Sequence, residues 1–89
     1  MSNTIPGGFT PFTAEISTSA QESFNKAFQG FVGARYSAVA VSTQIVAGTN
    51  YKFFCNTQSV TENPIPGIAI VSIYVSLEGE VHITHIQTI

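Results

Sequence analysis

The feature that most constrains this fold is one stretch of helical periodicity followed by a long succession of strand-like runs. Apolar side chains recur at spacings of three and four residues at Ile16, Ala20, Phe24, Ala27, Phe28 and Phe31. This spacing predicts one amphipathic helix whose apolar stripe faces a core. Thr13 is the expected N-cap, with Glu15 in the first turn, and Gly30 or Gly33 is expected to end the helix.

From position 36 onward, β-branched and aromatic residues dominate the sequence. Strands are predicted over 36–45, 49–56, 68–77 and 81–88, and a brief edge strand over 9–12 precedes the helix. Side chains alternate between the two faces of a strand. Alternation therefore puts Tyr51, Phe53 and Cys55 on one face of the second of these strands, and Val71, Ile73 and Val75 on one face of the third. The predicted order is therefore β-α-β-β-β-β. The predicted class is α+β, with one antiparallel sheet wrapped around one α-helix.

Length and composition limit the classes of function. The chain has 89 residues, which predicts a single domain over 1–89. Only 9% of residues are charged and three are cationic, so neither a nucleic-acid footprint nor a polybasic membrane patch is expected. No apolar run reaches the length of a membrane span. A single cysteine and an N-terminus unlike a signal peptide predict a cytoplasmic location.

Residues 44–48, Gln-Ile-Val-Ala-Gly, join two predicted strands. They resemble the Gln-x-Val-x-Gly signature of the cystatin superfamily, and the continuation Ala-Gly-Thr-Asn-Tyr is typical of stefins, the type 1 cystatins. Two more segments resemble this family in the expected order. Residues 5–8, Ile-Pro-Gly-Gly, resemble the amino-terminal trunk, and residues 76–79, Ser-Leu-Glu-Gly, resemble the second hairpin, where stefins usually have proline in place of Glu78.

The resemblance implies a cystatin fold and inhibition of papain-like, cathepsin-like cysteine proteases. The trunk and the two hairpin loops would form a wedge that occludes the protease cleft reversibly, without catalysis, cofactor or metal. The implied protease-binding residues are Gly7, Gly8, Gln44, Ile45, Val46, Ala47, Gly48, Leu77, Glu78 and Gly79. Small residues in this set permit close backbone approach, and Ile45, Val46 and Leu77 supply uncharged apolar area.

Each part of this set also has a plainer interpretation. Gly48 could simply supply a positive φ to a hairpin. Gly7 and Gly8 could form a flexible terminus, and Leu77 could be the last core residue of its strand. A second hypothesis is a cystatin-fold binding or structural module without inhibitory activity, which Glu78 favours. Such a module would use another surface, such as the loop predicted over 57–67 at the opposite end of the sheet.

The expected active form is a monomer. The short loop over 44–48 links two long strands, and such hinges favour domain swapping, so a swapped, inactive dimer is an available alternative.

Enzymatic sites find little support in the sequence. Cys55 is expected to be a buried, inert thiol because it shares a strand face with Tyr51 and Phe53. His82 and His85 are three residues apart in a strand, so they are expected to point to opposite faces and not to share a metal. We therefore predict a protein that is not an enzyme.

Overall fold

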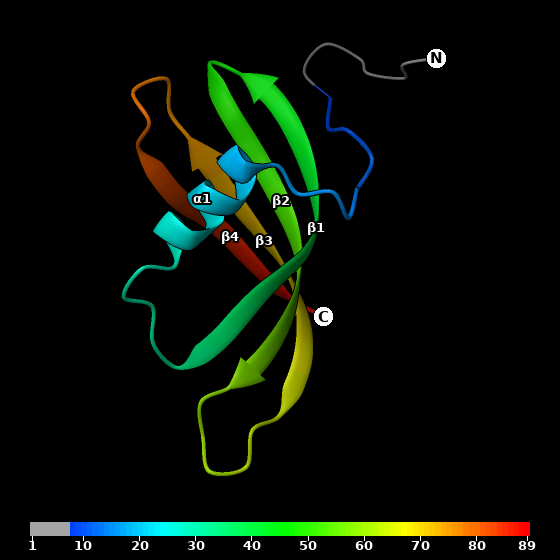
Figure 1. Ribbon diagram of the computed structural model, residues 1–89, viewed down its shortest axis with the longest axis vertical. Coiled ribbons are helices and arrows are strands. Elements are labelled where there is room, and N and C mark those ends of the chain that lie inside the picture. The colour runs from blue at the N-terminus through cyan, green and yellow to red at the C-terminus, as the bar shows by residue number, and fades with distance from the viewer. Residues whose placement is uncertain (1–7) are drawn as a thin grey trace.

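The computed structural model describes residues 8–89 as one helix packed on a four-stranded sheet. The elements in chain order are α1 (Thr18–Ala27), β1 (Ala34–Val46), β2 (Gly48–Ser59), β3 (Pro66–Val75) and β4 (Val81–Thr88). Neighbouring strands are antiparallel and lie in the order β1-β2-β3-β4. The sheet curves around α1, which lies across one of its faces (Figure 1). The predicted α+β class is confirmed.

The helix begins at a different residue from the one predicted. Ser17 is the N-cap, and its hydroxyl accepts a hydrogen bond from the Ala20 amide at 3.1 Å. The prediction of Thr13 as the N-cap was wrong. The Thr13 amide donates to the Val41 carbonyl in β1, and the Val41 amide donates to the Thr13 carbonyl. A residue held in extended pairing cannot also begin a helix. The helix also ends earlier than predicted, at Ala27, three residues before Gly30.

The predicted edge strand over 9–12 does not form, and the described residues contain four strands. Residues 10–13 instead run beside β1 with interrupted pairing. The Thr10 amide donates to the Thr43 carbonyl at 2.9 Å, and Thr13 forms an isolated antiparallel bridge with Val41. Pro11 lies between these two contacts, and because proline has no amide hydrogen it cannot donate to a ladder at that position.

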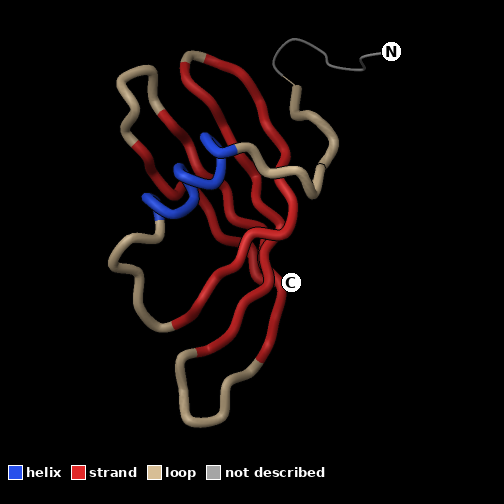
Figure 2. The backbone as a smooth tube through the Cα atoms, in the orientation of Figure 1, coloured by secondary structure: helices blue, strands red, loops and turns tan. Residues whose placement is uncertain are grey.

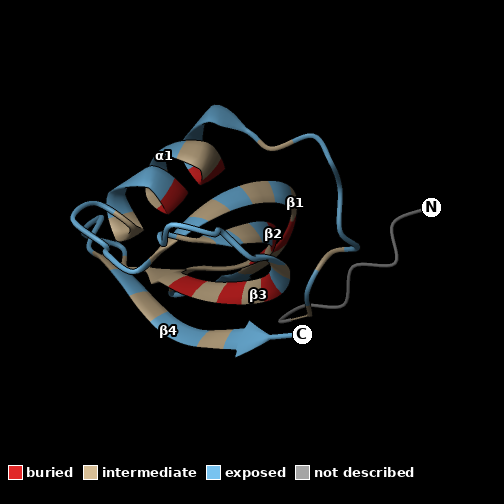
Figure 3. Ribbon diagram, turned by 90° about the horizontal axis from the view of Figure 1, so that it is seen from below, coloured by how far each residue is buried: buried red, intermediate tan, exposed pale blue. Residues whose placement is uncertain are grey.

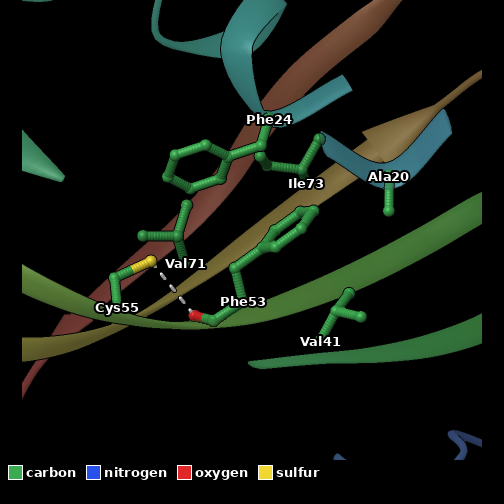
Figure 4. Packing of buried hydrophobic residues seen from close by; sticks show 7 residues of the cluster. All are labelled: Ala20, Phe24, Val41, Phe53, Cys55, Val71 and Ile73. Carbon is green, nitrogen blue, oxygen red and sulfur yellow. Dashed lines mark hydrogen bonds between the residues drawn. The ribbon is translucent and has the colours of Figure 1, made fainter. Parts of the chain in front are cut away.

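The core lies between α1 and the concave face of the sheet, as the burial colours of Figure 3 show. The buried apolar cluster consists of Ala20, Phe24, Val41, Phe53, Cys55, Val71 and Ile73 (Figure 4). The Phe24 ring of α1 lies 4.9 Å from the Phe53 ring of β2. The predicted helix stripe and the predicted strand faces therefore meet in one cluster. Phe31 is the exception, because the helix ends before it and its ring packs beside Phe28 and Tyr36 instead.

A β-bulge in β4 changes the orientation of its histidines. His82 pairs with Tyr74 and His85 pairs with Ser72, and Thr84 is the extra residue between them. Since Ser72 and Tyr74 are two apart and share a face of β3, both histidines lie on the outer face of the sheet. The prediction that they point to opposite faces was wrong because it assumed uninterrupted alternation. Both side chains are exposed.

The loop between β2 and β3 lies at the end of the sheet remote from the two hairpin turns (Figure 2). It spans residues 60–65 and is shorter than the predicted 57–67, because β2 and β3 extend further than predicted. The Ser59 hydroxyl accepts from the Ile65 amide at 2.8 Å and closes the loop at its base. Within residues 8–89, no helix has the length and apolar character needed to cross a membrane.

Candidate functional site

Two turns distant in sequence lie side by side at one end of the sheet (Figure 1). One turn joins β1 to β2 at Ala47, and the other joins β3 to β4 over residues 76–80. The pairing of Thr49 with Val75 fixes this proximity, because each turn starts next to one member of that pair. We call residues 45–48 and 76–80 together the hairpin tips.

The first tip is unusually tight. Val46 pairs with Gly48, so Ala47 is the only residue between the strands. Gly48 has a φ of +102°, and a Cβ there would clash with the Val75 carbonyl oxygen and lie 2.8 Å from the Tyr74 hydroxyl. Gly48 is thus required by its backbone conformation and by the close approach of β3. The positive φ expected of Gly48 in a hairpin is confirmed.

Side chains on both sides hold this tip in place. The Tyr74 hydroxyl donates a hydrogen bond to the Ala47 carbonyl. Asn50 Nδ2 donates to Gln44 Oε1 at 2.8 Å, across the β1–β2 pair. Gln44 and Gly48, the two fixed ends of the signature, therefore both support the shape of the hairpin.

The hairpin tips expose large apolar side chains. Leu77 is 76% exposed and Ile45 is 69% exposed, and Val46 beside them is also exposed. The interpretation of Leu77 as a core residue is wrong, because β3 ends at Val75 and Leu77 lies in the turn. No side chain over 44–48 is ionisable. The tips therefore present apolar surface that can be desolvated at low cost.

Hydrogen bonds between Ser76 and Glu80 close the second tip around Glu78. The Ser76 amide donates to the Glu80 carbonyl at 2.9 Å, and the Ser76 hydroxyl accepts from the Glu80 amide at 3.0 Å. Gly79 takes a positive φ of +89° and donates its amide to the Ser76 carbonyl. Glu78 and Glu80 are exposed, so this tip carries negative charge beside Leu77.

The N-terminal segment is tied to the edge of the same sheet. Gly7 lies outside the described residues, whereas Gly8 is described and half-buried. Ser42 of β1, the one buried polar residue among residues 8–89, donates its hydroxyl hydrogen to the Thr10 carbonyl. Lys52 Nζ lies 4.4 Å from the centre of the Phe9 ring.

No local sequence pattern marks Ser42, Asn50 or Tyr74 as a supporting residue. Each makes its contact with a residue whose position depends on the tertiary fold or on the strand register. The strand alternation around Tyr74 could have placed it on the outer face of the sheet, but it names no partner. Ser42 follows a β-bulge between Ala38 and Ala40, and alternation does not hold across a bulge.

Cys55 is fully buried in β2, and its Sγ lies 3.5 Å from the Phe53 carbonyl oxygen (Figure 4). Burial raises the pKa of Cys55 to about 12, because the apolar surroundings disfavour the thiolate. The expectation of a buried thiol is confirmed. Among the residues that the structure describes, no three His, Cys, Asp or Glu side chains gather as metal ligands would.

Comparison with known families, curated proteins and solved structures finds no match to this chain. Function is therefore inferred from the geometry of the hairpin tips and from the residues at 44–51 that resemble the stefin signature.

Proposed function

We propose that the protein is a reversible, tight-binding inhibitor of papain-like cysteine proteases with a stefin-like cystatin fold. The observation that carries this proposal is the adjacency of the two hairpin tips, which expose Ile45, Val46 and Leu77 at one end of a sheet wrapped around a helix. In this proposal, residues 10–13 stand in place of the first strand of the fold.

The shape of the first tip supports insertion into a narrow cleft. Only Ala47 separates the strands, and it is exposed and carries only a methyl group, so the backbone can approach an enzyme closely. Burying a Leu or Ile side chain fully contributes roughly 1.5–3 kcal/mol, so the exposed Ile45 and Leu77 can supply a substantial driving force. The inhibitor performs no chemistry, because it occludes the catalytic thiol and presents no aligned scissile bond.

The contacts behind the first tip support tight binding in a second way. The Tyr74–Ala47 and Asn50–Gln44 hydrogen bonds hold the turn before any partner arrives. A surface that is already ordered loses less conformational entropy on association. The Ser42–Thr10 contact similarly holds the chain that leads from Gly8 into the fold.

The two glutamates of the second tip bear on target choice. Glu78 and Glu80 are exposed next to Leu77. A protease with a basic or neutral surface beside its cleft would accept them, whereas an acidic surface would repel them. We propose that they select among proteases.

The experiment is a titration of active papain with the purified protein, followed by hydrolysis of a fluorogenic peptide. We expect stoichiometric and reversible loss of activity with a nanomolar or tighter inhibition constant. Absence of inhibition of papain and of a panel of cathepsin-like enzymes would contradict the proposal and favour the non-inhibitory binding module. Replacement of Gly48 is a poor test, because the contact with Val75 makes the variant unstable for structural reasons.

We further propose that the active form is a cytoplasmic monomer. The single cysteine, buried and free, is compatible with a reducing compartment. A domain-swapped dimer would straighten the turn at Ala47 and remove the first tip, so it is proposed to be inactive.

A further inference from the structure

A polar hollow lies on the sheet near the loop 60–65, at the end remote from the hairpin tips. It is an open surface depression with a volume of about 410 Å³, and its lining comes from three strands: Arg35, Ser37, Asn56, Thr57, Gln58 and Pro66. A second hollow of about 270 Å³ shares Arg35 and Gln58 and continues along the loop past Val60 and Pro64. The Arg35–Gln58 pair thus borders both depressions. The larger one lies within the size range of small ligand sites, which is roughly 300–1,000 Å³.

The strand register explains why polar side chains gather there. Arg35 pairs with Gln58, and Ser37 pairs with Asn56, in consecutive positions of one face of the β1–β2 ladder. Cβ atoms of directly paired residues lie roughly 4.5–5.5 Å apart, so the four side chains form a compact square. We call Arg35, Ser37, Asn56 and Gln58 the Arg35 quartet. All four are exposed.

The charge of this quartet is not neutralised within the part of the chain that the structure describes. No carboxylate lines either hollow, and the Arg35 guanidinium has no ion pair or hydrogen bond with the described residues. The other two cations are elsewhere, Lys26 in α1 and Lys52 against the Phe9 ring. Arginine stays protonated at every physiological pH, so the quartet carries one permanent positive charge.

The chemistry of the quartet fits a carboxylate. A guanidinium presents a planar fork of donors that matches the two oxygens of a carboxylate. The Asn56 and Gln58 amides and the Ser37 hydroxyl add donors around the same point. One cation balances one carboxylate, whereas a phosphate dianion would be left with uncompensated charge.

The second hollow indicates that the ligand extends beyond its carboxylate. Val60, which is 57% exposed, and Pro64 both line this hollow. A ligand whose acidic group meets Arg35 can therefore place an apolar group against Val60 and Pro64. An extended peptide with an acidic residue followed by an apolar residue has this composition.

From this arrangement we propose that the Arg35 quartet is a second binding site, which takes an acidic side chain of an extended peptide and packs the next, apolar residue against Val60. The site lies at the opposite end of the sheet from the hairpin tips, so it works independently of protease inhibition. A partner protein can bind there while the tips are engaged.

Nuclear magnetic resonance of the ¹⁵N-labelled protein tests this site with two matched peptides, acetyl-Glu-Val-amide and acetyl-Gln-Val-amide. We expect the glutamate peptide to shift the Asn56 and Gln58 amide signals saturably, and the glutamine peptide to bind at least tenfold more weakly. Equal binding of the two peptides, or shifts confined to residues outside the two hollows, would overturn the proposal.

Variants separate the two parts of the ligand. Arg35→Gln is expected to weaken binding of the glutamate peptide at least tenfold, while Lys26→Gln, which removes a distant cation, leaves it unchanged. Val60→Ser is expected to weaken binding of the peptide several-fold but not that of glutarate, a small dicarboxylic acid. If glutarate binds as tightly as the peptide, the assignment to a peptide is wrong. Papain inhibition by Arg35→Gln is expected to equal that of the wild type, so the two proposals can fail separately.

Discussion

The Tyr74 hydroxyl in β3 donates a hydrogen bond to the carbonyl of Ala47, the only residue between β1 and β2. This bond connects the first hairpin to a third strand. Tyr74 also pairs with Asn50, whose amide group holds Gln44. The shape of the first tip therefore depends on one side chain that lies 27 residues further along the chain.

Replacement of Tyr74 by Phe removes this bond and keeps the ring. We expect the free energy of unfolding to fall by about 0.5–1.5 kcal/mol, and amide hydrogen exchange over residues 45–48 to accelerate. Tyr51→Phe is the matched control, since the Tyr51 hydroxyl makes no hydrogen bond with residues 8–89. Equal exchange rates at the tip in both variants would show that Tyr74 does not restrain it.

Alanine variants of Gly48 and Gly30 distinguish the cost of backbone strain from the cost of a steric clash. Both have positive φ, but a Cβ at Gly48 would meet the Val75 carbonyl, whereas a Cβ at Gly30 would meet nothing within 4 Å. Backbone strain alone costs roughly 1–3 kcal/mol in each alanine variant. Forcing extra volume against β3 adds about 1–3 kcal/mol more to Gly48→Ala. Urea unfolding of the two variants measures the difference, and equal losses would mean that β3 moves aside freely.

Leu77→Ala tests the second tip in protease inhibition. Because Leu77 is exposed in the free protein, the variant is expected to unfold like the wild type. Loss of its buried area in a complex, about 1.5–3 kcal/mol, corresponds to a roughly 10- to 150-fold higher inhibition constant. Ile65→Ala is the control, since Ile65 is 71% exposed at the opposite end of the sheet. Similar effects of both substitutions on papain inhibition would contradict the role of the tips.

Cys55 predicts a specific dependence of stability on alkaline pH. Burial raises its pKa from the ordinary value of 9.0 to about 12 in the folded chain. Above pH 9 the unfolded chain loses the thiol proton while the folded chain keeps it, so stability falls as pH rises from about 9 to 12. The slope contributed by one such group approaches about 1.4 kcal/mol per pH unit.

Cys55→Ala lacks this contribution, so its unfolding free energy is expected to fall less steeply over the same pH range. The wild-type thiol is also expected to resist modification by a disulfide reagent at pH 8 until urea unfolds the chain. Parallel pH profiles of the two proteins, or rapid modification of the folded wild type, would show that the thiol is accessible.

Ser42→Ala tests the attachment of the N-terminal segment. The substitution leaves the Thr10 carbonyl without the hydroxyl donor, at an expected cost of about 1–2 kcal/mol in unfolding free energy. Faster amide exchange is expected at Thr10 and Thr13. Ser37→Ala, an exposed change on the same strand, is the control. If both variants exchange alike over residues 10–13, the backbone contacts with Val41 and Thr43 hold the segment without Ser42.

Sequence periodicity was sufficient to predict the helix stripe and the core face of β2 and β3. Phe24, Phe53, Val71 and Ile73 are buried as expected, because spacing alone determines which side of an element a residue occupies. The exposure of Ile45 at the first tip could likewise be predicted from the sequence, since Ile45 lies at a turn between two strands.

The predictions that failed concerned features that depend on contacts between distant residues or on interruptions in strand pairing. Thr13 has the chemistry of an N-cap, but its pairing with Val41 is a tertiary contact that no local pattern contains. His82 and His85 share a face because of one extra residue, Thr84, and a single insertion in the ladder has no sequence signature here. The roles of Tyr74 and Ser42 were missed for the same reason as Thr13.

The one-residue turn at Ala47 joins two paired strands, and this affects when a chain can become a monomer or a swapped dimer. Exchange of α1 and β1 between two chains would require the whole β1–β2 ladder to separate, from the pair of Ala34 with Ser59 to the pair of Val46 with Gly48. Phe24 would also have to leave the core. The activation barrier for exchange would then approach that of global unfolding. Monomers that have folded would persist as monomers, and the choice between one chain and two would be made while the polypeptide folds, according to its concentration at that moment.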